Sequence, residues 1–438
     1  MQTLSPTAVR IARSLLPLAG VAAPLIALVR IVMWSVNVPY SDDWDWTGFS
    51  AAMRTGTLSW DQLWTPHNGH RELVVTLEFL AIDRLGGWNV VREELLSLAC
   101  LVIGLIALYR LLRRTLEPLA ADVAFVISAW LLAGPIAFES VLIGSNLGWP
   151  LGAAAMLVTA DRLCAPDRSW RDVALAATGA VIASFTLAPG LLVWPCGLVI
   201  LLGRRASWRT VASWCAAWAC TLAAFFSGYP GNAAAAVGRA HSAGDAFHYA
   251  LVFLGTPLRS AEMTLQILEA IGAMVTIAFV IGTVAAQRCP DERERAWPFI
   301  ALGAYALLGA AVTSFTRAGL GEGQAMSPRY VSVSAFLLVA AVALLLPRAL
   351  ALRTAASRSA AAVAALVLLA VLARSEKLGS TLWRDYDWHR GVAVQGLAHD
   401  DRTTFRESYP DPVRLGQYLE ILRSVDDGPL DYGGNKRH

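Results

Sequence analysis

Long apolar runs recur from one end of the 438-residue chain to the other, and they limit its possible folds more than any other feature. A bilayer core is about 30 Å thick, so a helix needs about 20 mostly apolar residues to cross it. A mean hydropathy of +0.50 with only 16% charged residues argues against a soluble globular protein. The sequence predicts an all-α polytopic membrane protein with about eleven spans, at residues 14–36, 92–112, 119–138, 149–164, 173–188, 191–203, 206–227, 264–287, 297–316, 330–347 and 359–373.

Arginines alternate with these spans in a way that predicts their orientation. The short loops 139–148 and 188–190 carry no Lys or Arg, whereas the segments on the other side are basic. Since short cytoplasmic loops are enriched in Lys and Arg, we expect a cytoplasmic N-terminus. An odd number of spans then puts the C-terminus outside, which fits a bacterial inner (plasma) membrane. The arginines that carry this argument are Arg10, Arg13, Arg110, Arg113, Arg114, Arg162, Arg168, Arg171, Arg204, Arg205, Arg209, Arg288, Arg293, Arg295, Arg348, Arg353 and Arg358.

The predicted topology divides the chain into a transmembrane domain, residues 1–373, and a small extracytoplasmic C-terminal region, residues 374–438. Within the first part, the loops 37–91 and 228–263 also lie outside. The span pair at 173–203 has an alternative, because "APG" between two short apolar segments is also compatible with one re-entrant hairpin.

Two of these outer parts contain predicted helices. The loop 37–91 favours amphipathic helices at 42–54 and 70–84, with Ser41 or Asp42 as the cap of the first. In the tail, "DPVRLGQYLEIL" predicts a helix near 411–424, with Asp411 as N-cap and Pro412 at the first helical position.

The stretch "VPYSDDWDWTGFS", residues 38–50, places adjacent aspartates directly after the first span. Two neighbouring carboxylates repel each other, which raises the pKa of one and suits a general base. Asp42 and Asp43 are therefore candidate catalytic residues, whereas we expect Asp45, two residues further along, to face elsewhere and tolerate substitution. The structural alternative is a polar helix end with Trp34, Trp44 and Trp46 as an interfacial aromatic belt.

The same loop contains "TPHNGHRELVV", in which His67, His70 and Arg71 lie close together, and Arg71 shares a predicted helical face with Val75 and Glu78. A His-x-x-His pair can bind metal, but no third ligand is evident, so we expect hydrogen bonding and no metal site. No cofactor is predicted to be required, and a divalent cation is the less favoured alternative.

Basic residues also frame a late outer loop, "SFTRAGLGEGQAMSPRYVSVS". Arg317 and Arg329 stand at its two ends, and Tyr330 follows Arg329 at the start of a span. A guanidinium binds phosphate through a planar fork of donors, which makes both arginines candidates for a phosphate site. Snorkelling of these side chains to lipid headgroups is the alternative.

A first span followed by an outer loop opening with "DDW", amphipathic loop helices, about eleven spans and a late "SPRY" resemble the bacterial GT-C superfamily of membrane glycosyltransferases. The residues that carry the resemblance are Asp42, Asp43, His70, Arg71 and Arg329. The resemblance implies that an acidic residue of the first outer loop is the catalytic base and that the donor is a polyprenyl-phosphate sugar. The short tail differs from the extended outer acceptor-binding domains of that superfamily, so the acceptor stays open among glycans, lipids and proteins of the cell envelope.

The expected reaction is an inverting hexosyl or pentosyl transfer, because a single displacement inverts the anomeric centre. Deprotonation of the acceptor and stabilisation of the released phosphate are its two requirements. We expect Asp43 or Asp42 to act as base, with Asp43 slightly preferred. The expected phosphate ligands are Arg329, Arg317, Arg71 and Tyr330, and the expected positioning or sugar-stacking residues are His67, His70, Trp44, Trp46 and Trp64.

Two other functions use similar chemistry. A lipid-linked sugar flippase or transporter also needs arginines near a lipid phosphate, but it favours matching broken helices in two halves, and only one interrupted pair, 186–197, is present. An O-antigen ligase or polymerase usually has a large late outer loop, whereas the long loop here is the first. Nucleic acid is excluded as a partner, since the net charge of +3 leaves no basic patch once the inner-loop arginines are explained. The remaining partner is the bilayer itself.

Overall fold

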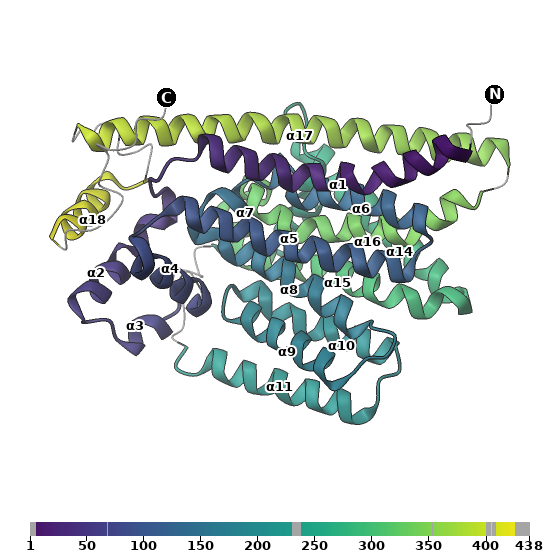
Figure 1. Cartoon of the computed structure of the whole chain (residues 1–438), viewed down its shortest axis with the longest axis horizontal. Helices are drawn as coiled ribbons and strands as arrows, with labels where there is room; N and C mark the ends of the chain where they lie inside the picture. Colours follow the sequence, from purple (N-terminus) through teal and green to yellow (C-terminus); the bar gives the residue numbers. More distant parts are fainter. Residues whose placement is uncertain are drawn as a thin grey trace.

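The computed structural model describes residues 6–67, 69–229, 238–352, 354–399, 404 and 409–424, and these residues form helices without a β-strand. Figure 1 shows the long helices side by side in one elongated bundle, with a group of short helices at one end. The predicted all-α class is therefore confirmed.

Within the described residues, seven helices are long and apolar enough to cross a membrane. All eleven predicted spans coincide with helices, but α8, α9 and α10 are short and α11 does not reach the same standard, so a count of eleven spans is not established. The seven are α1 (Pro6–Trp34), α5 (Val90–Thr115), α6 (Pro118–Ala133, continued by a 3₁₀ turn to Ala137), α14 (Leu265–Arg288), α15 (Pro290–Arg317), α16 (Val331–Leu350) and α17 (Ala355–Ala398). The others are α8 (Gly148–Leu163), α9 (Trp170–Ser184), α10 (Val193–Gly203) and α11 (Trp208–Phe226).

Short 3₁₀ segments and single turns connect the bundle helices. The turn η4 separates α9 from α10, so residues 173–203 form two helices with a turn between them. These connecting elements are η2 (Pro135–Ala137), α7 (Glu139–Leu142), η3 (Gly144–Leu147), η4 (Ala188–Leu192), η5 (Thr256–Leu258), η6 (Ala318–Leu320), η7 (Glu322–Met326) and η8 (Pro328–Tyr330).

A further helix, α13 (Ala243–Gly255), lies in the part predicted to be an outer loop. It packs against α14 and α15 and buries Tyr249 and Phe253 completely. Its approach to α14 requires glycine, because a Cβ at Gly255 would lie 2.2 Å from the carbonyl oxygen of Leu268. Thirteen residues are too few to span a bilayer, so a search for long apolar runs could not find this helix.

The loop 37–91, predicted to lie outside, forms η1 (Ser41–Trp46), α2 (Thr47–Thr55), α3 (Trp60–Trp64) and α4 (Leu73–Gly86), in general agreement with the two predicted loop helices. Together with α18 (Pro412–Ser424) these helices enclose a second hydrophobic core, separate from the core of the bundle. Trp44 and Trp46 are 0% and 6% exposed in this core. They therefore cannot belong to an aromatic belt at the headgroups, and of the three expected belt residues Trp34 alone is exposed.

The last long helix, α17, has 44 residues. At 1.5 Å per residue it is about 66 Å long, roughly twice the thickness of a bilayer core. Figure 1 shows it along one side of the bundle, beside α1 and as far as the end that carries α2, α4 and α18. The predicted boundary at residue 374 falls inside this continuous helix. The predicted cap of α18 is confirmed, since the Asp411 carboxylate accepts the N–H groups of Val413 and Arg414 at 3.0 and 3.2 Å.

Candidate active site

The two adjacent aspartates of "SDDWDW" have different environments. Ser41 has φ +52°, in the left-handed region, and the chain enters η1 from this strained position. Asp42 is exposed, whereas Asp43 is 1% exposed. The Asp43 carboxylate accepts the N–H of Tyr40 at 3.1 Å and the N–H of Ser145 at 2.8 Å. The expected cap by Ser41 or Asp42 is wrong. The carboxylate of Asp43 caps η1 instead, because it accepts the N–H of Tyr40.

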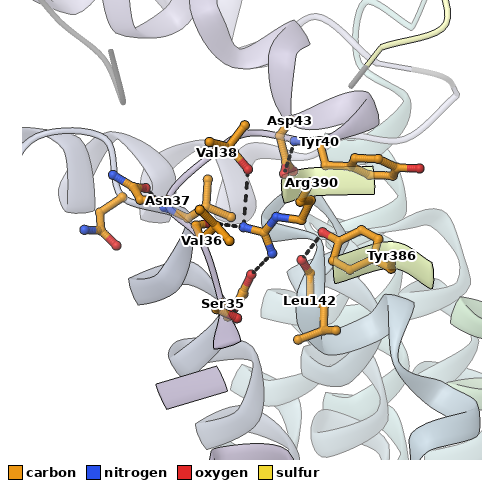
Figure 2. Close-up of polar contacts among 12 residues, drawn as sticks. Ser35, Val36, Asn37, Val38, Tyr40, Asp43, Leu142, Tyr386 and Arg390 are labelled. Atoms are coloured by element: carbon orange, nitrogen blue, oxygen red, sulfur yellow. Dashed lines mark hydrogen bonds and ion pairs between the residues drawn. The ribbon is translucent and has the colours of Figure 1, made fainter. Parts of the chain in front are cut away.

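Burial raises the pKa of Asp43, although the N–H groups of Ser145 and Tyr40 and the charge of Arg390 oppose the shift. Figure 2 shows Asp43 and Tyr40 next to the side chain of Arg390. Asp43 therefore fixes the entry of η1 to the turn η3, and both of its oxygens already have a partner.

The charge of Asp42 interacts with one acidic residue, Glu72, and with one arginine, Arg329. Burial holds the pKa of Glu72 well above its usual range, and the negative charges of Asp42 and Asp45 raise it further. On the other side, Asp42 is near enough to Arg329 to interact with its charge. Because Asp42 is exposed, its carboxylate is accessible to a substrate hydroxyl, which is the first requirement for a general base.

His70 is held in a tight turn and is neutral. Its backbone exchanges two hydrogen bonds with His67, of 2.9 and 2.8 Å, and Gly69 between them has φ +82°. Burial lowers the pKa of His70 to about 3, with further contributions from the positive charges of Arg317, His67 and Arg329. The N–H of Ala188 donates to Nδ1 at 3.2 Å, so the proton resides on Nε2, which is a donor.

Arg329 lies in η8 and Arg317 at the C-terminal end of α15, and both act on the charge of His70. The backbone of Arg329 is anchored, because Glu139 accepts the Ser327 hydroxyl at 2.7 Å and the Arg329 N–H at 3.4 Å. Arg317 and Arg329 are thus near enough to His70, and Asp42 near enough to Arg329, for their charges to interact.

Tyr330 is buried, whereas Arg317 and Arg329 are partly exposed. It is 3% exposed, and its hydroxyl accepts the Gln324 amide at 3.0 Å. Gln324 in turn accepts the hydroxyl of Tyr249. The ring of Tyr330 lies 5.6 Å from the Arg329 guanidinium, so Tyr330 supports the arginine from behind instead of contacting a ligand itself.

Arg71 is separate from the other arginines. It is 2% exposed and donates to the carbonyl oxygens of Trp64, Phe225 and Ser227. Its guanidinium also lies 4.5 Å from the Trp64 ring. With Nε and both terminal nitrogens directed at carbonyls, Arg71 joins the first loop to the end of α11, and its expected contact with phosphate is not supported.

The three expected sugar-stacking tryptophans have different positions. Trp44 and Trp46 are buried in the second core and offer no ring face to a ligand. Trp64 is partly exposed, but the Arg71 guanidinium lies over its ring. The ring also stacks on Trp60, with 5.4 Å between the ring centres. The expected sugar-stacking role is therefore wrong for Trp44 and Trp46, because a hydrophobic loop core needed those rings.

Asp45 also departs from expectation. Its carboxylate accepts the hydroxyls of Tyr409 and Tyr418, and Arg414 approaches it at 3.4 Å. His67 lies 3.8 Å from the same carboxylate. Asp45 thus docks helix α18 onto the first loop. The sequence gave no sign of this role, because the tyrosine partners lie 364 and 373 residues away.

The sequence also gave no reason to select Glu72 or Glu139, since an isolated acid in an ordinary helical pattern carries no signal. In the described part of the chain, no three or more His, Cys, Asp or Glu side chains form a group that could hold a metal ion.

No family model matches the chain, and no curated protein matches its sequence. Two solved structures are similar in fold. A crystal structure of ArnT from Cupriavidus metallidurans bound to undecaprenyl phosphate aligns with a TM-score of 0.48 and 16% identity, over 94% of this chain and 77% of that one. The archaeal oligosaccharyltransferase AglB from Archaeoglobus fulgidus, in complex with an inhibitory peptide and a dolichol-phosphate, aligns with 0.47 and 15%, over 92% of this chain and 59% of that one. Both likenesses are too distant to transfer the role of any residue.

Proposed function

We propose that this protein is an inverting membrane glycosyltransferase of the GT-C type that uses a polyprenyl-phosphate sugar as donor. One observation carries the proposal: an exposed aspartate, Asp42, interacts electrostatically with Arg329, which together with Arg317 also acts on the charge of His70. An acid–base group and a phosphate-binding group are the two parts that such a transfer needs.

In the proposed reaction an acceptor hydroxyl attacks the anomeric carbon of the donor. The new carbon–oxygen bond forms as the bond to the phosphate oxygen breaks, and the hydroxyl proton passes to the Asp42 carboxylate. The phosphodiester becomes a phosphate monoester and gains negative charge. Arg317 and Arg329 stabilise this charge more in the transition state than in the bound donor, which is the condition for a faster reaction.

Asp42 is the better base of the adjacent pair. Asp43 has no room for an acceptor, because it is buried and two backbone N–H groups occupy its oxygens. An exposed carboxylate can approach a substrate hydroxyl directly. We therefore assign proton abstraction to Asp42 and the shape of the loop to Asp43.

Neutral His70 fits a role as hydrogen-bond donor. With Nδ1 occupied by the Ala188 N–H, its Nε2–H is available for a phosphate or sugar oxygen near Arg317 and Arg329. The site lies at the end of the bundle that carries α2 to α4 (Figure 1), and the arginine pattern predicts that this end lies outside the cytoplasm. A lipid-linked donor suits that side, and the acceptor is a hydroxyl of a cell-envelope glycan, lipid or protein.

The test uses the purified full-length protein in lipid nanodiscs with a panel of radiolabelled polyprenyl-phosphate hexoses and pentoses and a membrane extract as acceptor. Transfer of label from one donor to a new product, lost in Asp42→Asn, supports the proposal. Label that crosses the membrane of proteoliposomes still attached to its lipid would identify a transporter and overturn it.

A further inference from the structure

We propose that Arg390, near the outer end of α17, is a positioning residue that holds the backbone leading into Asp42 and Asp43. This inference rests on the proposed function, since it concerns the geometry of the same loop. It makes helix α17 part of the active site, although Arg390 is almost 350 residues away from the aspartates in sequence.

Arg390 is buried in the protein interior, and both of its terminal nitrogens donate hydrogen bonds. Its side chain is 1% exposed, and one terminal nitrogen donates to Glu94 of α5 at 2.6 Å. The other terminal nitrogen donates to the carbonyl oxygens of Val36 and Val38, the latter at 3.3 Å. Figure 2 shows the side chain of Arg390 next to Val36 and Val38. Ser35 completes the arrangement, because its hydroxyl donates to the second oxygen of Glu94.

Tyr386, one helical turn before Arg390, contacts the other side of the loop. Its hydroxyl donates to the carbonyl of Leu142 at 2.6 Å, and its ring meets the Tyr40 ring edge-on at 4.8 Å. The guanidinium of Arg390 lies 5.2 Å from the centre of the Tyr386 ring. Figure 2 shows both side chains reaching from α17 toward the loop and the turn at Leu142.

These contacts hold both anchors of Asp43. The Asp43 carboxylate depends on the N–H of Tyr40, two residues after Val38, and on the N–H of Ser145, three residues after Leu142. Arg390 fixes the first of these segments and Tyr386 the second. The position of η1, and with it the direction of Asp42, therefore depends on α17.

Stability alone does not explain a buried pair of this kind. Taking two charges out of water costs about as much as their attraction returns, and an apolar pair of similar size is often as stable. An apolar pair cannot, however, donate hydrogen bonds to the carbonyls of Val36 and Val38. The feature specific to arginine is that one side chain neutralises Glu94 and holds these two carbonyls at once.

The experiment separates a positioning role from a structural one with a double substitution. Arg390→Met alone leaves Glu94 buried and unpaired, so we expect poor folding. Glu94→Leu with Arg390→Met removes both charges and should recover the thermal midpoint of the wild type to within a few degrees. Turnover should nevertheless stay at least tenfold below wild type, with donor affinity unchanged, because Arg317 and Arg329 are untouched.

Two further variants calibrate the result. Arg390→Lys keeps the charge beside Glu94 but cannot reach the two carbonyls together, so its turnover should be intermediate. Arg384→Ala removes an exposed arginine from the same helix and should match wild type. A stable double variant with wild-type turnover would reduce the pair to a structural role and overturn the proposal.

Hydrogen exchange keeps this test independent of the proposed reaction. In the double variant the amides of Tyr40 and Ser145 should exchange at least tenfold faster than in wild type, while those of α16 stay unchanged. If the wild type transfers no sugar at all, the proposed function fails but the exchange rates still report on positioning. Unchanged exchange at both amides would overturn the inference even if the enzyme is active.

Discussion

Replacing Asp42 and Asp43 separately by asparagine should produce two different defects. Asparagine keeps the size of the side chain and removes its charge. At exposed Asp42 the free energy of unfolding should change by no more than about 0.5 kcal/mol, as for surface substitutions generally. Turnover should fall about 10²-fold or more, since a general base contributes on this scale. That loss corresponds to about 2.7 kcal/mol in the activation barrier.

At Asp43 the structure predicts the opposite order of effects. Its two oxygens accept two N–H groups, at 3.1 and 2.8 Å, whereas an asparagine amide offers one acceptor oxygen and one N–H₂ donor. Either Tyr40 or Ser145 is then left with a buried, unsatisfied N–H, which costs about 1–3 kcal/mol. A cost of 1 kcal/mol already shifts an opening equilibrium by a factor of about 5. Turnover falls as a consequence of the displaced loop.

The assay combines thermal unfolding, donor binding and single-turnover transfer on the wild type and both variants. Asp42→Asn should unfold like wild type, bind donor like wild type and fail in transfer. Asp43→Asn should unfold at a lower temperature. Full transfer by Asp42→Asn would show that the base lies elsewhere, and an unchanged unfolding temperature for Asp43→Asn would refute its two-acceptor role.

Three further predictions concern the surroundings of the pair. Arg329→Ala should weaken donor binding about tenfold or more, and Arg329→Lys should restore only part of it because the planar fork is lost; equal affinities in titrations would indicate a snorkelling side chain. Asp45→Asn should weaken the docking of α18 by about 1–3 kcal/mol, seen as faster hydrogen exchange at Pro412–Ser424, since Arg414 and two tyrosine hydroxyls lose a charged acceptor. The pKa of His70 is about 3 in the folded protein, so between about pH 6.5 and pH 3 the unfolded chain binds a proton at this residue and the folded chain does not. The free energy of unfolding should therefore be highest above about pH 6.5 and fall toward pH 3. His70→Gln should make this fall shallower in thermal unfolding.

Much of the fold could be predicted from the sequence, because the relevant forces act locally. A run of apolar residues is costly to leave in water wherever the chain goes, and each predicted span accordingly became a helix. The cap of α18 was equally predictable, since Asp411 binds N–H groups only two and three residues away. The short buried helix α13 escaped notice because its burial comes from its neighbours and not from its own length.

The candidate site was predictable only in part. The combination of acids in the first long loop with arginines in a late one was expected from the resemblance to GT-C glycosyltransferases, and in the structure Arg317 and Arg329 act on the charge of His70 while Asp42 interacts with Arg329. The choice between Asp42 and Asp43 was not, because the two are equivalent until a turn at Ser41 directs one outward and the other inward. The expected sugar binding by Trp44 and Trp46 was wrong for a similar reason. The sequence does not tell whether an aromatic ring faces a ligand or a hydrophobic core.

Contacts between distant segments were beyond any pattern in the sequence. Arg390 lies in a helix whose charged outer half has the composition of an ordinary solvated surface, and Glu94 lies at the start of a predicted span. Their pairing depends on how far a helix of about 66 Å extends past a bilayer core of about 30 Å, and on which turn of it then meets the first loop. Hydropathy and local capping determined where the chain is helical, but the relative placement of these helices, set by packing across hundreds of residues, decided which carboxylate is exposed and which side chains hold it there.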